Sequence, residues 1–215
     1  MMEDEDYFIL GPNAELAVRF VCKLCNSGWM SDLECAVKPT MADMIANIAI
    51  PLDKQQQFDI CRWMLKTALI LDAFADRKAG RGYFGPEERK LVSEGRLPSF
   101  THAWLVRYSG GDFPIFSRGV NLWFGGIPNS IESTKAYCYT FAVGFFGAQL
   151  LCSRVPPGRD APVRIGVRPG PWEATTIQIW PTRGSLEWPP PQSLDDGSPG
   201  FMNFAERWSW GHRIR

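Results

Sequence analysis

The stretch DKQQQFDICRWMLKTALILDAFA, residues 53–75, decides the fold of this chain. Its polar side chains recur at intervals of four, three and four residues, which places them on one narrow stripe of a helix: Gln55, Asp59, Arg62 and Lys66. Apolar side chains fill the rest of the girth, so we expect the helix to be buried on most sides. Asp53 is a suitable N-cap. The pattern predicts that this helix is the spine of the helical part of the molecule.

The residues before this helix predict a cysteine-bearing helix and short edge strands. Two apolar stretches, at 7–10 and 16–21, flank the turn sequence GPN and indicate a small hairpin or two edge strands. Residues 26–38, NSGWMSDLECAVK, carry apolar side chains at helical spacing, and Ser31 opens a capping-box pattern that can start the regular helix there. Pro39 then indicates a break, or the first turn of a following helix.

From about residue 101 the pattern changes to short, β-rich and partly alternating stretches separated by glycine and proline turns. A short helix bracketed by Pro86 and Gly95 precedes them. The order of elements predicts an α+β fold, in which an N-terminal helical part with the cysteine-bearing helix packs on a C-terminal antiparallel β-rich part. We divide the chain into regions 1–98 and 99–215 and expect one compact unit. The predicted strands are HAWLVRYS (102–109), FPIFS (113–117), VNLWFG (120–125), KAYCYTFAVG (135–144), FGAQLLC (146–152), VRIGV (163–167) and TTIQIW (175–180).

The proline-rich segment 180–200 is predicted to drape over the surface, with Trp180 and Trp188 holding it down. A short helix near residues 201–208 is expected to follow.

Composition and charge restrict the classes of function. The chain has 215 residues, of which 45% are hydrophobic and 13% aromatic, as in folded globular proteins. Its formal net charge is zero, which gives no overall attraction to nucleic acid or anionic membranes. The longest apolar runs are shorter than the roughly 18 residues of a membrane span. The acidic start MMEDEDYFIL does not resemble a secretory signal, so we expect a cytoplasmic protein that makes no contact with membranes.

The charges are nevertheless distributed unevenly. Residues 1–50 carry three basic against eight acidic side chains, whereas residues 151–168 carry four arginines against one aspartate. An anion or a nucleic acid would therefore be drawn to the second segment. The simpler interpretation is a solvated loop and strand edge, because most surface charge has no ligand. The candidate anion-binding residues are Arg154, Arg159, Arg164 and Arg168.

Two of the six cysteines form the motif VCKLCNSGWMSDLE at residues 21–34, with Cys22 and Cys25 three positions apart. Without a secretory signal, all six cysteines are expected to be reduced thiols. A Cys-x-x-Cys pair can be half of a zinc site, because two thiolates on one turn occupy adjacent corners of a tetrahedron. It can also be a redox dithiol, but that interpretation requires a thioredoxin-like βαβ unit, and the downstream sequence pattern does not predict one.

The stretches CKLCNSGWMSDLE, KPTM, WMLKTALILDAF and IQIWP…EWPPP resemble a family of uncharacterised bacterial and phage proteins with an HNH-type, treble-clef zinc fold. In that family the Cys-x-x-Cys-Asn segment is the second half of the metal site and lies at the start of a helix. The first half is an upstream Cys-x-x-Cys followed by a Glu-His pair that supplies the nuclease base. The present chain departs from this pattern, because no cysteine or histidine precedes Cys22. The resemblance therefore implies a shared fold, while the residues argue against shared catalysis, since Asn26 alone can neither bind the metal nor act as the base.

Three outcomes remain open for a metal. Cys35 and Cys61 can complete a zinc site with Cys22 and Cys25, although both are equally well explained as small buried residues. A zinc ion can also be shared between two copies of the chain. The interpretation we favour is a vestigial half-site of two reduced thiols at a helix N-terminus, with Trp29 packed beneath, so that no cofactor is predicted.

The remaining candidates are predicted to be structural. His102 begins a strand without a nucleophile motif nearby. Aromatic residues on the predicted strands can stack on bases, but core filling is the better explanation. They are Trp104, Tyr108, Trp123, Tyr137 and Tyr139.

The sequence therefore predicts a non-catalytic macromolecule-binding protein, of the interaction or inhibitor type, with a protein as its partner. The first alternative is a nucleic-acid-binding protein or an HNH-type nuclease with an incomplete or shared metal site. The second is an enzyme of unrelated chemistry in the β-rich half.

Overall fold

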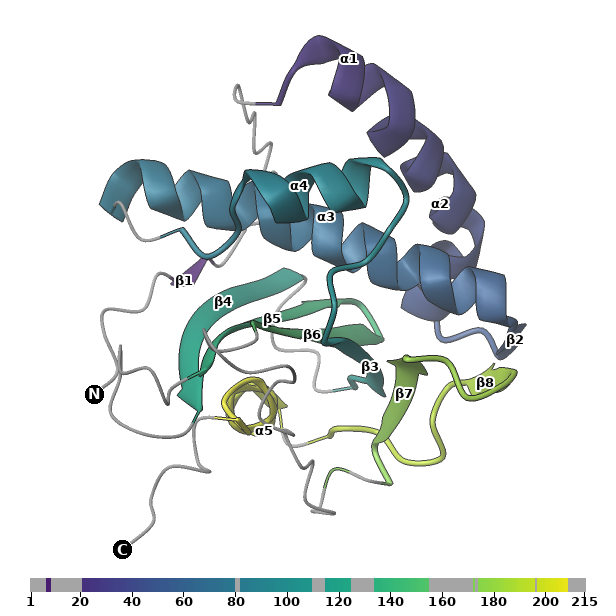
Figure 1. The fold of residues 1–215 in the computed structure, drawn as a ribbon. Coiled ribbons are helices and arrows are strands. Elements are labelled where there is room, and N and C mark those ends of the chain that lie inside the picture. The colour runs from purple at the N-terminus through teal and green to yellow at the C-terminus, as the bar shows by residue number, and fades with distance from the viewer. Residues whose placement is uncertain are drawn as a thin grey trace, which may run out of the picture.

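The computed structural model describes residues 7–8, 21–79, 82–109, 115–124, 134–154, 172, 174–195 and 197–208. Its centre is a six-stranded antiparallel sheet with the strand order β1-β4-β5-β6-β3-β7. The long helix α3 and the short helix α4 lie over one face of this sheet, and α5 lies against the other (Figure 1). This arrangement confirms the predicted α+β fold, with the helices first and the antiparallel sheet after them.

The sheet is built mainly from the second half of the chain. Its strands are β3 (Thr101–Arg107), β4 (Ile115–Phe124), β5 (Thr134–Val143), β6 (Phe146–Ser153) and β7 (Thr176–Trp180), and β1 (Tyr7–Phe8) adds to the β4 edge. A separate two-stranded ribbon joins β2 (Ile50–Leu52) to β8 (Leu186–Trp188). Both β1 and β2 pair with strands from beyond residue 99.

The predicted strands FPIFS and VNLWFG form one continuous strand, β4, and not two. Gly119 lies at the junction and does not break the strand. It makes room for a neighbour instead, because a Cβ atom there would come within 2.1 Å of the hydroxyl oxygen of Tyr137. Strand VRIGV lies outside the residues that the structure describes, as does the second stretch of the predicted N-terminal hairpin except for Val21.

The cysteine-bearing segment is helical almost from its start. A single turn, α1 (Lys23–Cys25), leads through a π-helical turn, η1 (Asn26–Met30), into α2 (Ser31–Ile45). The regular helix does begin at Ser31, but no side chain caps it, so the predicted capping box does not form.

The predicted break at Pro39 is wrong, because Pro39 lies inside α2. A proline in a helix removes the hydrogen bond to the carbonyl four residues earlier, here that of Cys35. Both residues lie on the exposed face of the helix, where water can take the place of the missing donor. The opposite face of α2 is held by burial of Leu33, Val37, Met41 and Met44.

Helix α3 (Lys54–Ala79) is the predicted spine. Asp53 caps it as expected: the Gln56 amide N–H donates to Asp53 Oδ1 at 2.8 Å, and the Asp53 amide donates to Gln56 Oε1 at 2.9 Å. Most of its side chains between Gln57 and Asp72 are buried or half-buried, which confirms burial on most sides.

The predicted polar stripe of α3 does not stay in water along its whole length. Gln55 is exposed, but Lys66 is buried and its ammonium group forms an ion pair with Glu34 of α2. The sequence predicted the polar stripe but not which part of it is exposed, and Lys66 is buried because α2 packs over that part of the helix.

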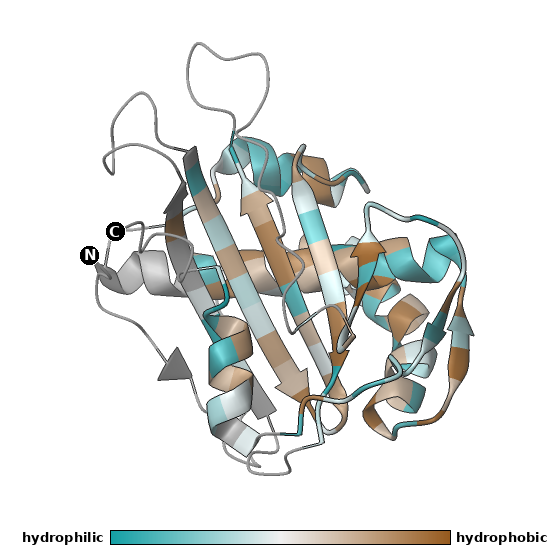
Figure 2. Ribbon diagram, turned by 90° about the horizontal axis from the view of Figure 1, so that it is seen from below, coloured by the Kyte–Doolittle hydropathy of each residue, from teal (hydrophilic) through white to brown (hydrophobic). Residues whose placement is uncertain are grey.

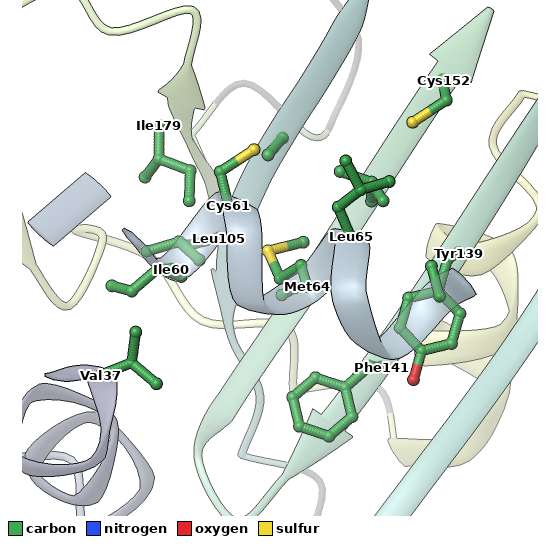
Figure 3. Packing of buried hydrophobic residues seen from close by; sticks show 14 of the residues in the cluster. Val37, Ile60, Cys61, Met64, Leu65, Leu105, Tyr139, Phe141, Cys152 and Ile179 are labelled. Carbon is green, nitrogen blue, oxygen red and sulfur yellow. The ribbon is translucent and has the colours of Figure 1, made fainter. Parts of the chain in front are cut away.

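The main core lies between α2, α3 and the sheet. Figure 3 shows Cys61, Met64 and Leu65 of α3 facing Tyr139, Phe141 and Cys152 of the sheet. Trp188 of β8 is buried in the same core and Trp180 packs against it, as predicted for the proline-rich segment. The short helix α4 (Pro86–Ser93) begins at Pro86 and ends before Gly95, which has a φ of 77°.

Helix α5 (Gly197–Ala205) and the turn that follows it lie against part of the opposite face of the sheet (Figure 2). Two smaller apolar clusters lie there, one around Phe201 and Phe204 and one around Trp104 and Leu151. Among the described residues, no helix is long and apolar enough to cross a membrane.

Candidate functional site

The cysteine turn, residues 22–28, is the first candidate site. Cys22 is the N-cap of α1, and its sulfur accepts a hydrogen bond from the backbone amide of Cys25 at 3.2 Å. The backbone amide of Asn26 donates to the carbonyl of Cys22 at 3.0 Å, so the turn is closed by main-chain contacts. Residues three apart on a helical turn lie on one side, which brings the two thiols together.

The two thiols share a hydrogen bond that separates their acidities. The hydrogen bond from Cys25, with the backbone amide as a second donor, holds the pKa of Cys22 below the ordinary value for a thiol. The same thiol–thiol hydrogen bond raises the pKa of Cys25. A thiolate at Cys22 is therefore favoured over one at Cys25, and it is the more nucleophilic and more metal-binding form of the residue.

The cysteine turn projects from the end of α2 away from the sheet (Figure 1). Neither α1 nor η1 contains a buried residue, and the side chain of Leu24 is 85% exposed. Trp29 packs against the main core and anchors the base of the turn, as expected from the sequence. Gly28 has φ −104° and ψ −120°, outside the helical range, which marks the bend between the turn and α2.

The other candidate zinc ligands lie elsewhere. Cys35 is exposed on α2, and Cys61 is buried in the main core beside Leu65 (Figure 3). Burial raises the pKa of Cys61 well above the ordinary value, as for a thiol that packs as an apolar side chain. Within the described residues, no three or more histidine, cysteine, aspartate or glutamate side chains gather where they could hold a metal.

Arg154 is the one member of the predicted arginine cluster that the structure describes, since Arg159, Arg164 and Arg168 lie outside the described residues. Its guanidinium group is already engaged. It forms an ion pair with Glu88, with 2.8 Å between Arg154 Nη2 and Glu88 Oε1, and it donates to the carbonyl of Tyr83. It also lies 4.7 Å from the centre of the Tyr83 ring. These contacts tie β6 to the start of α4.

A shallow groove of ≈ 730 Å³ runs beside this ion pair. Its walls are mostly apolar, from Phe84, Leu91 and Phe100, with Glu88 and Arg154 at the polar side. The two charges oppose each other at 2.8 Å, so the groove offers no net positive charge to an anion.

His102 packs against an aromatic neighbour, and the strand aromatics lie in the core. His102 is the second residue of β3 and stacks on Trp104 with 5.8 Å between ring centres, and burial lowers its pKa. Trp104, Tyr108, Tyr137 and Tyr139 are all buried, which confirms core filling over an open stacking face. The side chain of Trp123 lies outside the described residues.

Sequence reasoning missed a buried polar network on the α5 face. Gln149 of β6 donates to the hydroxyl of Thr140 at 2.9 Å and to the carbonyls of Phe204 and Ala205, each at 3.2 Å. Its carbonyl oxygen accepts from Arg207 Nε at 2.6 Å and from Trp208 Nε1 at 2.7 Å. The polar residue inside FGAQLLC was the available signal, but its partners at residues 204–208 are more than 50 residues away in sequence.

A second missed feature is the buried carboxylate of Asp72 on α3. It accepts hydrogen bonds from the backbone amides of Tyr83 and Phe84, each at 2.9 Å. These bonds hold the segment between α3 and α4 against the end of α3. We interpret Asp72 as structural, because its carboxylate oxygens accept hydrogen bonds from the main chain.

A third feature is a set of apolar side chains at the end of α2 and on the adjoining β5–β6 turn, Ile45, Ile48 and Phe145, named here the hairpin patch. Ile48 is 51% exposed and Phe145 is 37% exposed, whereas Ile45 is half-buried. The β5–β6 turn meets α2 here, because the amide of Phe145 donates to the carbonyl of Ile45 at 3.2 Å.

The backbone of the hairpin patch is fixed on both sides. After α2, the amide of Ile48 donates to the Asp43 carbonyl at 2.8 Å and the amide of Asn47 to the Met44 carbonyl at 3.1 Å, with Asn47 at a φ of 61°. This is a Schellman motif. The carbonyl of Phe145 accepts from the amide of Tyr108 at 2.9 Å. Both exposed side chains therefore stand on a rigid frame.

Comparison of the chain with family models, with curated proteins and with solved structures finds no match. The resemblance to HNH-type proteins therefore stays a prediction that rests on the sequence motifs.

Proposed function

We propose that this chain is a non-catalytic protein-binding module and that the hairpin patch is its docking surface. The observation that carries the proposal is the placement of Ile48 and Phe145, two large apolar side chains at chain turns, which are positions that polar residues usually occupy. Exposed apolar side chains that gather on a rigid frame are the pattern of a binding surface, whereas scattered ones need no explanation.

The rigidity of the hairpin patch supports binding for a thermodynamic reason. A surface that is already in its bound conformation loses less conformational entropy when a partner docks. The Schellman motif at the end of α2 and the hydrogen bonds of the β5–β6 turn provide that fixed conformation. The patch is small, so we expect it to be the centre of a larger contact and not its whole extent.

A nucleic acid is the alternative partner, and Arg154, the described member of the arginine cluster, supports it less well. A nucleic-acid site needs cationic side chains that are available to phosphates. The guanidinium group of Arg154 instead forms an ion pair with Glu88 and lies over the Tyr83 ring.

The test compares three purified forms of the full chain as bait in extracts of its host: the wild type, the double variant Ile48→Glu/Phe145→Glu, and Leu24→Glu. Leu24→Glu is the matched control, because it makes the same change at an exposed position separated from the patch by the length of α2, roughly 22 Å. The captured protein is then purified and its affinity for each form is measured.

We expect the double variant to bind at least about tenfold more weakly than the wild type and the control, a loss of about 1.4 kcal/mol. Equal affinity of all three forms would reject the hairpin patch. Capture that nuclease treatment abolishes would support the nucleic-acid alternative. Metal-dependent cleavage of DNA that Asn26→Ala abolishes would reject the non-catalytic assignment.

A further inference from the structure

The cysteine turn carries a thiol pair that the proposed function does not use. The thiol of Cys25 and its backbone amide both donate hydrogen bonds to the sulfur of Cys22, the amide at 3.2 Å. Cys22 is exposed and Cys25 is half-buried, on a turn that projects away from the sheet (Figure 1). The two sulfurs therefore already meet at a surface that other molecules can reach.

The backbone of the turn has the dimensions that a disulfide needs. Cα atoms three residues apart on a helical turn are separated by roughly 5 Å, and the intervening Lys23 and Leu24 belong to α1. Bridged cysteines have Cα atoms about 4.4–6.8 Å apart. The amide of Asn26, which donates to the Cys22 carbonyl at 3.0 Å, holds the turn closed. A bond between the two sulfurs therefore requires rotation of the side chains and no rearrangement of the backbone.

The surroundings of the pair favour an attack by Cys22. Disulfide exchange proceeds through a thiolate, and the backbone N–H at the Cys22 sulfur stabilises its negative charge. The exposed Lys23 beside Cys22 favours both the thiolate and the approach of an anionic disulfide. Cys25 is less exposed, so an incoming disulfide meets Cys22 first.

We propose that Cys22 and Cys25 form a redox-active pair that exchanges reversibly with a small disulfide, the chemical class of oxidised glutathione. The Cys22 thiolate attacks one sulfur of the small disulfide, whose S–S bond breaks and releases one thiolate. Cys25 gives up its proton, attacks the Cys22 sulfur of the mixed disulfide and expels the second thiolate. The pair thus loses two electrons and two protons, which the small disulfide gains as it becomes two thiols.

The sequence-based objection to a redox pair concerned the thioredoxin fold and not the exchange itself. Exchange depends on the reach between the sulfurs, on access and on the thiolate, and the cysteine turn provides all three. The hairpin patch lies at the opposite end of α2, roughly 22 Å away. The redox proposal is therefore independent of the proposed function, and either can fail without the other.

The test equilibrates the reduced full chain, without oxygen, in buffers of varied reduced and oxidised glutathione. Remaining thiols are alkylated and the peptides are identified by mass. We expect a bridge between Cys22 and Cys25. Its formation releases two glutathione molecules, so the ratio of bridged to reduced chain should fall with the square of the reduced glutathione concentration. A mixed disulfide releases only one and would follow the first power.

Variants separate the two steps of the exchange. Cys25→Ser should stop at a mixed disulfide of Cys22 with glutathione, whereas Cys22→Ser should lose the bridge altogether. The matched control is Cys35→Ser, which removes an exposed thiol on α2 and should keep the bridge. The double variant Ile48→Glu/Phe145→Glu should also keep it, because the hairpin patch takes no part in the exchange.

Several results would overturn the proposal. Only mixed disulfides in the wild type, or no oxidation at any glutathione ratio, would show that the pair does not close. A bridge from Cys22 to Cys35, or to a second molecule, would show that the turn does not select Cys25. Equal rates of mixed-disulfide formation at Cys22 and Cys35 in Cys25→Ser would show that the turn does not activate Cys22. Circular dichroism of each variant checks that the fold is intact.

Discussion

The two faces of the central sheet are covered in different ways. On the α3 face, a long helix packs on one large apolar cluster, and its buried polar side chains pair with α2, β2 and neighbouring loops and not with the sheet: Gln57, Lys66 and Asp72. On the α5 face, a short helix covers two smaller apolar clusters, and Gln149, Arg207 and the Arg118–Glu206 ion pair lie beside them. The α3 face depends on area buried from water, while the α5 face depends also on polar groups that must each find a partner.

Adjacent residues of β6 show the difference directly. Leu150 belongs to the main core, Leu151 belongs to the cluster around Trp104, and Gln149 lies on the same face as Leu151. Because side chains alternate along a strand, one strand serves both faces. Substitutions at these positions therefore compare the two faces in one local backbone.

The largest effect is expected from α3 itself. Leu65→Ala should lower the free energy of unfolding by roughly 2–5 kcal/mol, because it removes a fully buried side chain from the main core. Leu69→Ala, at a slightly less buried position, should fall in the same range. The control Gln55→Ala, on the exposed start of the polar stripe, should change stability by less than about 0.5 kcal/mol. Urea unfolding measures all three, and equal losses at Leu65 and Gln55 would contradict the placement of α3.

The next prediction tests the comparison on β6. Leu150→Ala and Leu151→Ala both remove a side chain that is 0% exposed, and each should cost roughly 2–5 kcal/mol. We expect Leu151→Ala to lie at the lower end, because its cluster is smaller and the α5 side can close on the cavity more easily. Urea midpoints with unchanged slopes would measure this. A larger loss at Leu151 than at Leu150 would show that the α5 face is as tightly constrained as the α3 face.

The sequence predicted the α3 face better than the α5 face, and the reason is physical. A helix that is apolar around most of its girth must be buried whatever covers it, so residues 53–75 alone indicated the spine. Whether Lys66 is exposed to solvent depends on where α2 packs. The periodicity of α3 carries no information about the position of α2. Pro39 is a similar case. Proline usually breaks a helix, but on the exposed face of α2 water can take the place of the lost hydrogen bond.

The candidate sites were predictable to different degrees. The thiol pair was visible as a motif, since its spacing is local. The hairpin patch was not, because Ile48 and Phe145 are nearly 100 residues apart and come together through the backbone bond between Phe145 and Ile45. Gln149 and Arg207 are also far apart in the sequence. A polar residue in an apolar strand indicates that it has a hydrogen-bond partner, but not which residue that partner is.

The third prediction concerns the polar network of the α5 face. Gln149→Leu keeps the approximate shape of the side chain but removes the acceptor for Arg207 Nε and Trp208 Nε1. We expect a loss of roughly 2–3 kcal/mol, because buried donors left without an acceptor each cost about 1–3 kcal/mol. Loss of near-ultraviolet circular dichroism from Trp208 before global unfolding would place the damage at the end of α5.

The matched control for this prediction is Gln178→Leu. Gln178 is half-buried on β7 and donates one hydrogen bond, to the carbonyl of Trp180 at 3.1 Å. It should cost less than about 1 kcal/mol. If Gln149→Leu were neutral or stabilising, the α5 face would depend on apolar burial alone, and the contrast between the faces would be lost.

The smallest expected effect is a response to alkaline pH that should be equal on the two faces. Cys138 lies on the α5 face and Cys152 on the α3 face, and burial raises the pKa of each thiol to about 12. An unfolded thiol loses its proton near pH 9, the ordinary value for this group. The protonated thiols therefore stabilise the fold fully below about pH 9, and this contribution is lost as the pH rises from 9 towards 12. At pH 10 each thiol should account for a loss of about 1.4 kcal/mol.

We expect Cys138→Ala and Cys152→Ala to reduce the fall in unfolding free energy between pH 8 and pH 10 by similar amounts. Leu151→Ala, from the same cluster as Cys138, removes packing but no proton and should leave that fall unchanged. A smaller reduction for Cys138→Ala than for Cys152→Ala would mean that water reaches the α5 face more readily, and the two faces would then differ in how well they exclude solvent as well as in their polar content.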